Sequence, residues 1–130
     1  MISLQLLKYL ENNGYGTIDQ DLLWEKETLD KKGIFIVSNS EQTPRGSRRT
    51  QRFTLYSRGA NDVDGYKKLE AIRNFLSSFT TYENCTLPAV PPIVTEPVNN
   101  VTIMPMSTID NVGRDENGRL VWSCNGYIYY

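Results

Sequence analysis

Residues 33–58 read Gly-Ile-Phe-Ile-Val-Ser-Asn-Ser-Glu-Gln-Thr-Pro-Arg-Gly-Ser-Arg-Arg-Thr-Gln-Arg-Phe-Thr-Leu-Tyr-Ser-Arg. The four consecutive apolar residues at 34–37 predict a strand over 33–39 that is covered on both faces. Residues 40–47 have turn chemistry throughout. Residues 48–58 then alternate, with Phe53 and Leu55 on one side and polar or amphipathic residues on the other, which are Arg52, Thr54, Tyr56 and Arg58. The stretch therefore predicts a long β-hairpin with a basic tip.

The residues before this hairpin predict a short helix and a weak strand. Ser3 can cap a helix over 4–12, and Asn13-Gly14 can end it, because glycine adopts the left-handed conformation without steric cost. The apolar stripe of this helix is Ile2, Leu6, Tyr9 and Leu10. Residues 17–27 contain Leu-Leu-Trp at 22–24, which indicates a strand.

The residues after the hairpin predict a second helix and a closing hairpin. Asn61 or Asp62 caps a helix over 62–79, whose buried stripe is Tyr66, Leu69, Ile72, Leu76 and Phe79. Four prolines make the segment 80–100 extended and irregular. A strand over 101–109 contains Pro105, which lies either at a sheet edge or at the end of its ladder. Residues 113–118 form a hairpin turn before the last strand, 119–130.

This order of elements predicts an α+β fold. The chain shows no internal repeat, and its 130 residues suffice for one hydrophobic core, so we expect a single domain over 1–130. We expect a mostly antiparallel sheet of four to five strands, with both helices on one face and the long hairpin over 33–58.

Composition excludes several classes of protein. No apolar run approaches the length of a membrane span, and no signal-peptide pattern opens the sequence, so we expect no membrane contact and folding in a cytoplasm. Thiols stay reduced in that compartment, and we therefore expect Cys85 and Cys124 to be free.

The absence of histidine argues against catalysis. It removes the usual general base, the usual zinc ligand and every nucleophile that depends on histidine. Segments around Gly65 and Gly118 faintly resemble calcium loops, but both lack the first carboxylate and the final glutamate. We therefore expect no enzymatic activity, no metal and no cofactor.

The basic hairpin stands out in a chain whose formal net charge is −1. Residues 45–58 contain five arginines and no acid. Arg45, Arg48 and Arg49 at the tip could meet a protein partner or DNA through forked hydrogen bonds, or they could simply keep a solvated tip from aggregating. We expect Arg52 and Arg58 to project from the polar face of the strand, with their stems packed along it.

The aromatic residues at the C-terminal end allow two interpretations. Tyr127, Tyr129 and Tyr130 could fill the edge of the core as sheet residues. They could instead form a subunit contact, because tyrosine provides a large contact area at low entropy cost.

The order of these segments resembles a known family. Its features here are an opening helix that ends at Asn-Gly, an extended hairpin over 33–58, and a helix with the sequence Gly-Tyr-Lys-Lys-Leu-Glu-Ala-Ile-Arg-Asn-Phe-Leu at 65–76. The closing hairpin over 109–119 carries Gly-Arg-Asp-Glu-Asn-Gly and precedes a strand with Ser123 and Asn125. This pattern resembles the tail-terminator, or minor capsid, proteins of long-tailed bacteriophages, although the proline-rich segment 88–97 has no counterpart in it.

The resemblance implies a structural virion protein. Such a subunit forms a ring, expected to be a hexamer, that caps the tail tube, ends its polymerisation and provides the head–tail joining surface. The implied partners are the tail tube protein and the head–tail connector, with DNA passing through the lumen without sequence-specific binding. The implied location is the tail or neck of the virion, and the host cytoplasm during assembly.

Eight residues are the candidates for contacts with neighbouring subunits or rings. They lie in the hairpin tip, in the closing turn and at the C-terminal end: Arg45, Arg48, Arg49, Arg114, Asp115, Glu116, Tyr129 and Tyr130. Two other functions stay open, a neck or head-completion protein and a small nucleic-acid-binding or regulatory module.

Overall fold

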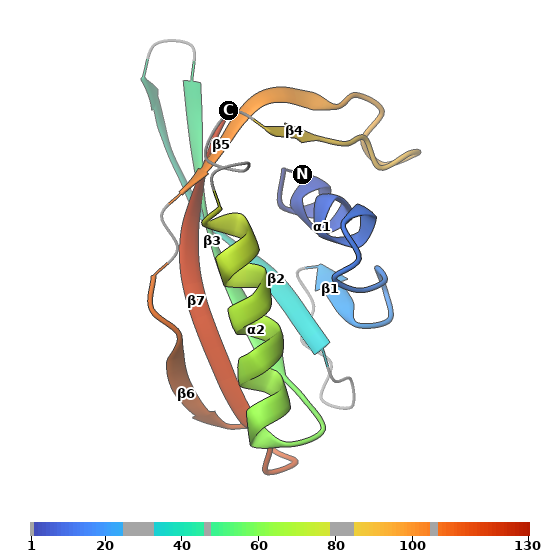
Figure 1. Cartoon of the computed structure of the whole chain (residues 1–130). Coiled ribbons are helices and arrows are strands. Elements are labelled where there is room, and N and C mark those ends of the chain that lie inside the picture. The colour runs from blue at the N-terminus through green and yellow to red at the C-terminus, as the bar shows by residue number, and fades with distance from the viewer. Residues whose placement is uncertain (1, 25–32, 46–47, 79–84, 105–106) are drawn as a thin grey trace.

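The computed structural model describes residues 2–24, 33–45, 48–78, 85–104 and 107–130, without the side chains of 40–45 and 48. These residues form two helices and seven strands (Figure 1). In chain order they are α1 (Ile2–Asn12), β1 (Leu22–Trp24), β2 (Gly33–Arg45), β3 (Arg48–Arg58), α2 (Asp62–Leu76), β4 (Cys85–Leu87), β5 (Val98–Met104), β6 (Asp110–Arg114) and β7 (Leu120–Tyr129).

The strands form one mixed, mostly antiparallel sheet that curls strongly into a half-barrel. The strand order is β1-β2-β3-β7-β5-β4, and β6 also pairs with β7. Only the pairing of β1 with β2 is parallel among the named strands. The predicted α+β class is confirmed, but the expected count of four to five strands is wrong, because β4 lies in the segment expected to be irregular and β6 precedes the closing turn.

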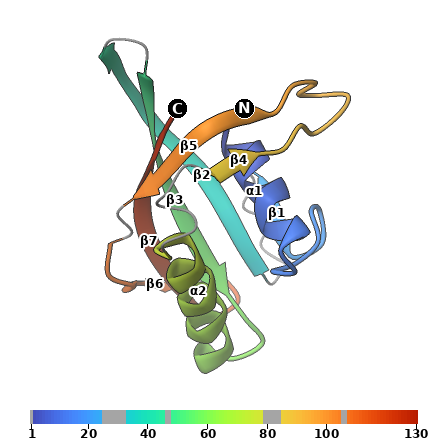
Figure 2. The same cartoon turned by 45° about the horizontal axis from the view of Figure 1, so that its top comes forward.

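The long β2–β3 hairpin is confirmed and is longer than expected. Its first strand continues to Arg45, through residues that were predicted to be a turn, because β3 offers a paired partner as far as Arg48. Register irregularities lie between Ser38 and Glu41 and between Gln42 and Arg45. The hairpin extends well beyond the helices (Figures 1 and 2). Residues 46–47 of the tip lie outside the described residues.

Strand β7 is the centre of the sheet. One edge pairs with β3 from Thr50↔Tyr129 to Ser57↔Trp122. The other edge pairs first with β6, starting at Arg114↔Leu120, and then with β5, ending at Thr102↔Tyr129. The predicted strand 101–109 is therefore β5, which starts and ends earlier and lies inside the sheet; Pro105 lies outside the described residues.

Helix α1 begins at Ile2, so Ser3 is not its cap. Ser3 is buried, and its hydroxyl accepts hydrogen bonds from Trp24 Nε1 at 2.8 Å and from the Ser38 hydroxyl at 2.7 Å. The side chain thereby ties the helix to β1 and β2. The predicted end of the helix and the weak strand at 22–24 are confirmed, and Gly14 has φ +84°.

Helix α2 begins as predicted, because the Asn61 side chain accepts a hydrogen bond from the backbone N–H of Asp64 at 2.9 Å. It ends at Leu76, earlier than expected, and Phe79 lies outside the described residues. The stacked rings of Tyr9 and Phe75, 5.7 Å apart, join the two helices. Both helices lie on the inner face of the sheet, as predicted, and share one hydrophobic cluster with it (Figure 2).

The proline-rich segment crosses the start of α1. Val90 and Val94 close a tight turn with backbone hydrogen bonds in both directions. The Gln5 amide, which is 3% exposed, donates to the carbonyl oxygens of Pro88 and Glu96, both at 3.1 Å. One buried side chain therefore holds both ends of this loop against the helix.

The core of α2 gives a stability prediction. Leu69 is fully buried, whereas Val63 on the same helix is 58% exposed. We expect Leu69→Ala to lower the free energy of unfolding by about 2–5 kcal/mol, because it removes buried apolar contacts and leaves a cavity. The exposed control Val63→Ala should change it by less than about 0.5 kcal/mol. Urea unfolding followed by circular dichroism measures both, and equal losses would contradict this packing.

Candidate functional site

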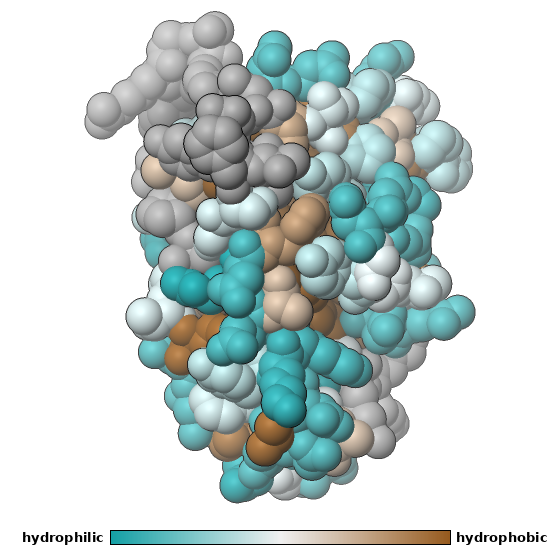
Figure 3. Space-filling view, viewed as in Figure 1, coloured by the Kyte–Doolittle hydropathy of each residue, from teal (hydrophilic) through white to brown (hydrophobic). Residues whose placement is uncertain are grey.

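The face of the sheet that points away from the helices is here called the outer face. Along β3, Gln51, Phe53 and Leu55 are buried on the inner side, and the alternate residues point to the outer face. This alternation was predicted, and Arg52 is exposed as expected. The opposite side of the molecule shows small, separate hydrophobic areas among hydrophilic ones (Figure 3).

Arg58 differs from its prediction, because it is fully buried on the outer face. Its Nη1 donates to Asp115 Oδ2 at 3.0 Å, and the Asp115 side chain is only 3% exposed. The guanidinium also lies 5.1 Å from the centre of the Phe35 ring. Strand β3 therefore reaches the closing turn through a buried ion pair, and its last arginine is not solvated.

Asp115 organises the closing turn. Its Oδ1 accepts hydrogen bonds from the backbone N–H groups of Asn117 at 3.0 Å and Arg119 at 2.9 Å. Its Oδ2 accepts from Arg119 Nε at 3.0 Å, in addition to Arg58. The carboxylate is thus committed to contacts within the chain, and the turn is held over the outer face.

These contacts change the acidity of Asp115. Burial by itself raises the pKa of the carboxyl group. The hydrogen bonds from the Arg119 backbone and the Arg58 side chain, together with the charge of Arg119, outweigh burial and lower the pKa from 3.8 to about 2.

The two neighbours of Asp115 project outward. Arg114 Nη2 lies 3.3 Å from Asp62 Oδ2, and both side chains are about half exposed, at 56% and 47%. An ion pair this exposed contributes little to stability. Glu116 is exposed at the tip of the turn. Of the three turn residues predicted to contact partners, Arg114 and Glu116 are therefore accessible, and Asp115 supports them.

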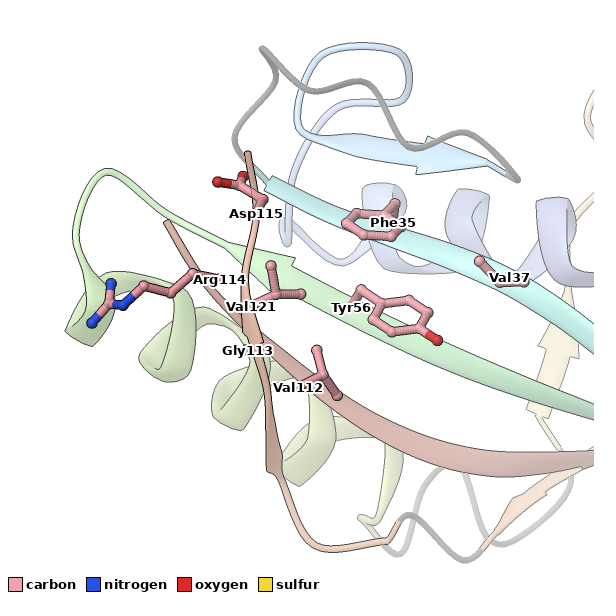
Figure 4. A pocket seen from close by; sticks show the side chains of 8 residues that line it. All are labelled: Phe35, Val37, Tyr56, Val112, Gly113, Arg114, Asp115 and Val121. Carbon is pink, nitrogen blue, oxygen red and sulfur yellow. The ribbon is translucent and has the colours of Figure 1, made fainter. Parts of the chain in front are cut away.

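A hollow lies between β6 and the strands beneath it (Figure 4). The cavity measures about 400 Å³, and its floor includes the stacked rings of Phe35 and Tyr56, whose centres are 5.0 Å apart. Val112 on β6 is 53% exposed and forms part of the wall. The complete lining is Phe35, Val37, Tyr56, Val112, Gly113, Arg114, Asp115 and Val121.

At the end of the sheet next to the hairpin, arginine lies near tyrosine on both faces. Arg49 and Tyr130 are on the inner side, in alternation with the inward-facing Gln51 and Ile128, and Arg52 and Tyr127 are on the outer face. The backbone groups of Arg49 and Tyr130 form a reciprocal pair of hydrogen bonds, at 2.6 and 2.9 Å. The guanidinium groups of Arg49 and Arg52 lie 5.2 and 5.7 Å from the ring centres of Tyr130 and Tyr127. The Tyr127 ring also stacks on that of Tyr129 at 6.2 Å.

The predicted contact residues thus fall into two separate groups. The structure brings Arg49, Tyr129 and Tyr130 together near the hairpin, where Arg45 pairs with Arg48 in the ladder. Residues 114–116 lie at the opposite end of β7 (Figure 1). Tyr129 is the last residue of β7 and Tyr130 directly follows it, and a role for them in subunit contact stays a prediction.

Sequence reasoning missed the hollow and the buried pair of Arg58 and Asp115. The alternation along β3 predicted that Tyr56 lies on the outer side, where it lines the hollow. No local signal in the sequence showed that β6 would cover this part of the sheet. The pairing partner of Arg58 lies 57 positions away, beyond the reach of any periodicity.

Metal binding, thiol chemistry and membrane contact each depend on particular features of the described residues. Among them, no three histidine, cysteine or acidic side chains are placed to hold a metal ion. Cys85 and Cys124 are free and buried, and burial raises the pKa of both thiols, that of Cys124 to about 12. Within the same part of the chain, neither helix is long and apolar enough to span a bilayer.

No protein-family model matches the chain. No curated protein sequence matches it either.

The acidity of Asp115 predicts a pH effect. Between about pH 4 and pH 2 the unfolded chain takes up a proton at Asp115 that the folded chain does not, so the contribution of this carboxylate to stability is present above its ordinary pKa and is lost as the pH falls toward about 2. We expect Asp115→Asn to be less stable than the parent at neutral pH, and its stability to decline less steeply in this window.

Urea midpoints measured across that pH range test this expectation. Glu116→Gln neutralises an exposed carboxylate in the same turn and serves as the control, which should keep the steep decline of the parent. Identical pH dependence of Asp115→Asn and the parent protein would show that Asp115 does not carry the effect.

Proposed function

We propose that this chain is a structural virion subunit that forms a ring with copies of itself, caps the tail tube, ends its polymerisation and provides the head–tail joining surface. The observation that carries this proposal is the β2–β3 hairpin. It extends far beyond the core that its base helps to build, and it bears a cluster of arginines.

Within the described ranges, the outer edge of β2 in the hairpin is largely unpaired. Strand β1 pairs with β2 only along Ile34–Ile36, and no other strand among the described residues pairs with the outer edge of β2 beyond that point. An extended strand with unpaired backbone groups is a template for association with another chain. Arg45 is paired with Arg48 in the backbone ladder at the far end of this edge.

A second open edge lies at the other end of the molecule. All five residues of β6 are exposed, and β6 pairs only with β7 in the described part of the chain. The two edges belong to different surfaces, so a contact between them joins unlike patches. Contacts of this heterologous kind generate rings when the rotation closes. This geometry supports self-assembly, and the resemblance described above supports the tail tube and head connector as partners and a hexamer as the ring.

Imaging of assembled tails tests the role at the tube. Tails made without this chain should be overlong when measured by negative-stain microscopy, because nothing ends polymerisation. Tails of normal length that fail to join heads would instead favour the neck or head-completion role.

The hairpin tip gives a separate prediction. We expect replacement of Arg45, Arg48 and Arg49 by alanine to leave the free energy of unfolding within about 0.5 kcal/mol per site, because the tip lies outside the core. Joining of tails to heads, scored in a complementation assay, should fall strongly. A control in which exposed Lys67 and Lys68 on α2 are changed to alanine should join normally. Normal joining by the tip variant would remove this role from the arginines.

A further inference from the structure

The outer face next to the hairpin has an unusual composition. It is built from residues 50–54 of β3, 125–129 of β7 and 102–104 of β5, which are paired side by side in the sheet. No acidic residue occurs among these positions. Because Gln51, Ile128 and Ile103 are buried on the inner side, their neighbours in each strand point outward. The outward residues are Thr50, Arg52, Thr54, Asn125, Tyr127, Tyr129, Thr102 and Met104. Thr54 is buried among them, because its hydroxyl is hydrogen-bonded to the side-chain oxygens of Asn39 and Asn125.

Arg52 is the main charge on this surface, here called the arginine–tyrosine face. The side chain is exposed and forms no ion pair with the described part of the chain. Its guanidinium lies over the Tyr127 ring, 5.7 Å from the centre. The positive charge therefore lies beside an aromatic ring and has no acidic partner among the described residues.

The surrounding side chains suit one kind of ligand. Threonine and tyrosine hydroxyls and asparagine amides are, with arginine, the groups that commonly contact nucleic-acid phosphates. The basic hairpin adjoins this face through β3, whose first residues are Arg48 and Arg49. An acid-free face of hydrogen-bond donors next to arginines complements a polyanion in charge.

We propose that the arginine–tyrosine face contacts the phosphate backbone of duplex DNA without reading its sequence. Arg52 supplies the charge, Tyr127 holds the guanidinium in place, and neighbouring hydroxyls add neutral hydrogen bonds. This inference deepens the proposed function, on which it rests for the source of the DNA, by naming the surface that meets it. It places the arginine–tyrosine face toward the DNA path of the ring.

Binding of a labelled duplex of about 20 base pairs to the full chain tests the proposal, with fluorescence anisotropy as the readout. Non-specific contacts of this kind have dissociation constants of about 1–100 μM at physiological salt and weaken steeply as salt increases. We expect measurable binding at low salt that declines linearly in a plot of log K against log salt concentration. We expect Arg52→Gln to reduce the magnitude of that slope by about 1, the contribution of one phosphate contact.

Two further variants serve as controls. Lys67→Gln removes one positive charge from an exposed position on α2, which packs on the inner face of the sheet, and should leave the slope unchanged. Tyr127→Leu removes the ring beneath Arg52 and should weaken binding while it keeps the net charge. Circular dichroism confirms that each variant is folded.

Three results would overturn the proposal. They are absence of binding at low salt with protein at about 100 μM, equal slopes for Arg52→Gln and the parent, and an equal loss of slope for Lys67→Gln. Sedimentation of the same variants identifies the competing occupant: if Arg52→Gln weakens self-association and leaves DNA binding intact, the face binds a second copy of the chain. None of these outcomes alters tail length, so the proposed function is tested separately.

Discussion

The backbone pairing of β7 is the constraint on which the rest of the structure depends. One edge of this strand accepts β3 along its length, and the other edge is shared between β6 and β5. Ser107 continues that second edge between them, since its backbone N–H donates to the Asn125 carbonyl and its hydroxyl accepts from the Asn125 N–H. The helices, the hairpin and the closing turn are all placed relative to this one strand.

The two ends of β7 carry different side-chain contacts. At one end, the buried contacts of Asp115 fix the turn and shape the hollow beneath β6. At the other end, Arg49 and Arg52 rest on tyrosine rings beside the hairpin. The molecule therefore presents unlike surfaces at its two ends, which is what a subunit needs in order to join copies of itself head to tail.

Local patterns predicted the elements whose signals lie within a few residues. The alternation of Phe53 and Leu55 defined β3, and Asn61 defined the start of α2. Strands β4 and β6 were not predicted, because each is short and is stabilised by a partner strand rather than by its own periodicity. The predicted cap Ser3 instead bonds to Trp24 and Ser38, which only the fold brings near it.

The candidate contact residues also divide into those that local sequence predicts and those that only the fold explains. The exposure of Arg52, Arg114 and Glu116 follows from local sequence, whereas the burial of Asp115 depends on Arg58 in a distant strand. A charged residue in a polar turn and a charged residue in a buried pair have the same sequence signature. Only the three-dimensional neighbours distinguish an accessible carboxylate from a structural one.

The low pKa of Asp115 has a consequence for the environments that this chain can tolerate. The Asp115 carboxylate that holds the closing turn stays charged from neutral pH down to strongly acidic pH. The chain also has no histidine, the side chain that most often acts as a proton-triggered release in assemblies. The contacts that Asp115 makes with Arg58 and Arg119 would therefore persist through mild acidification, and with them the shape of the β6 end of the outer face.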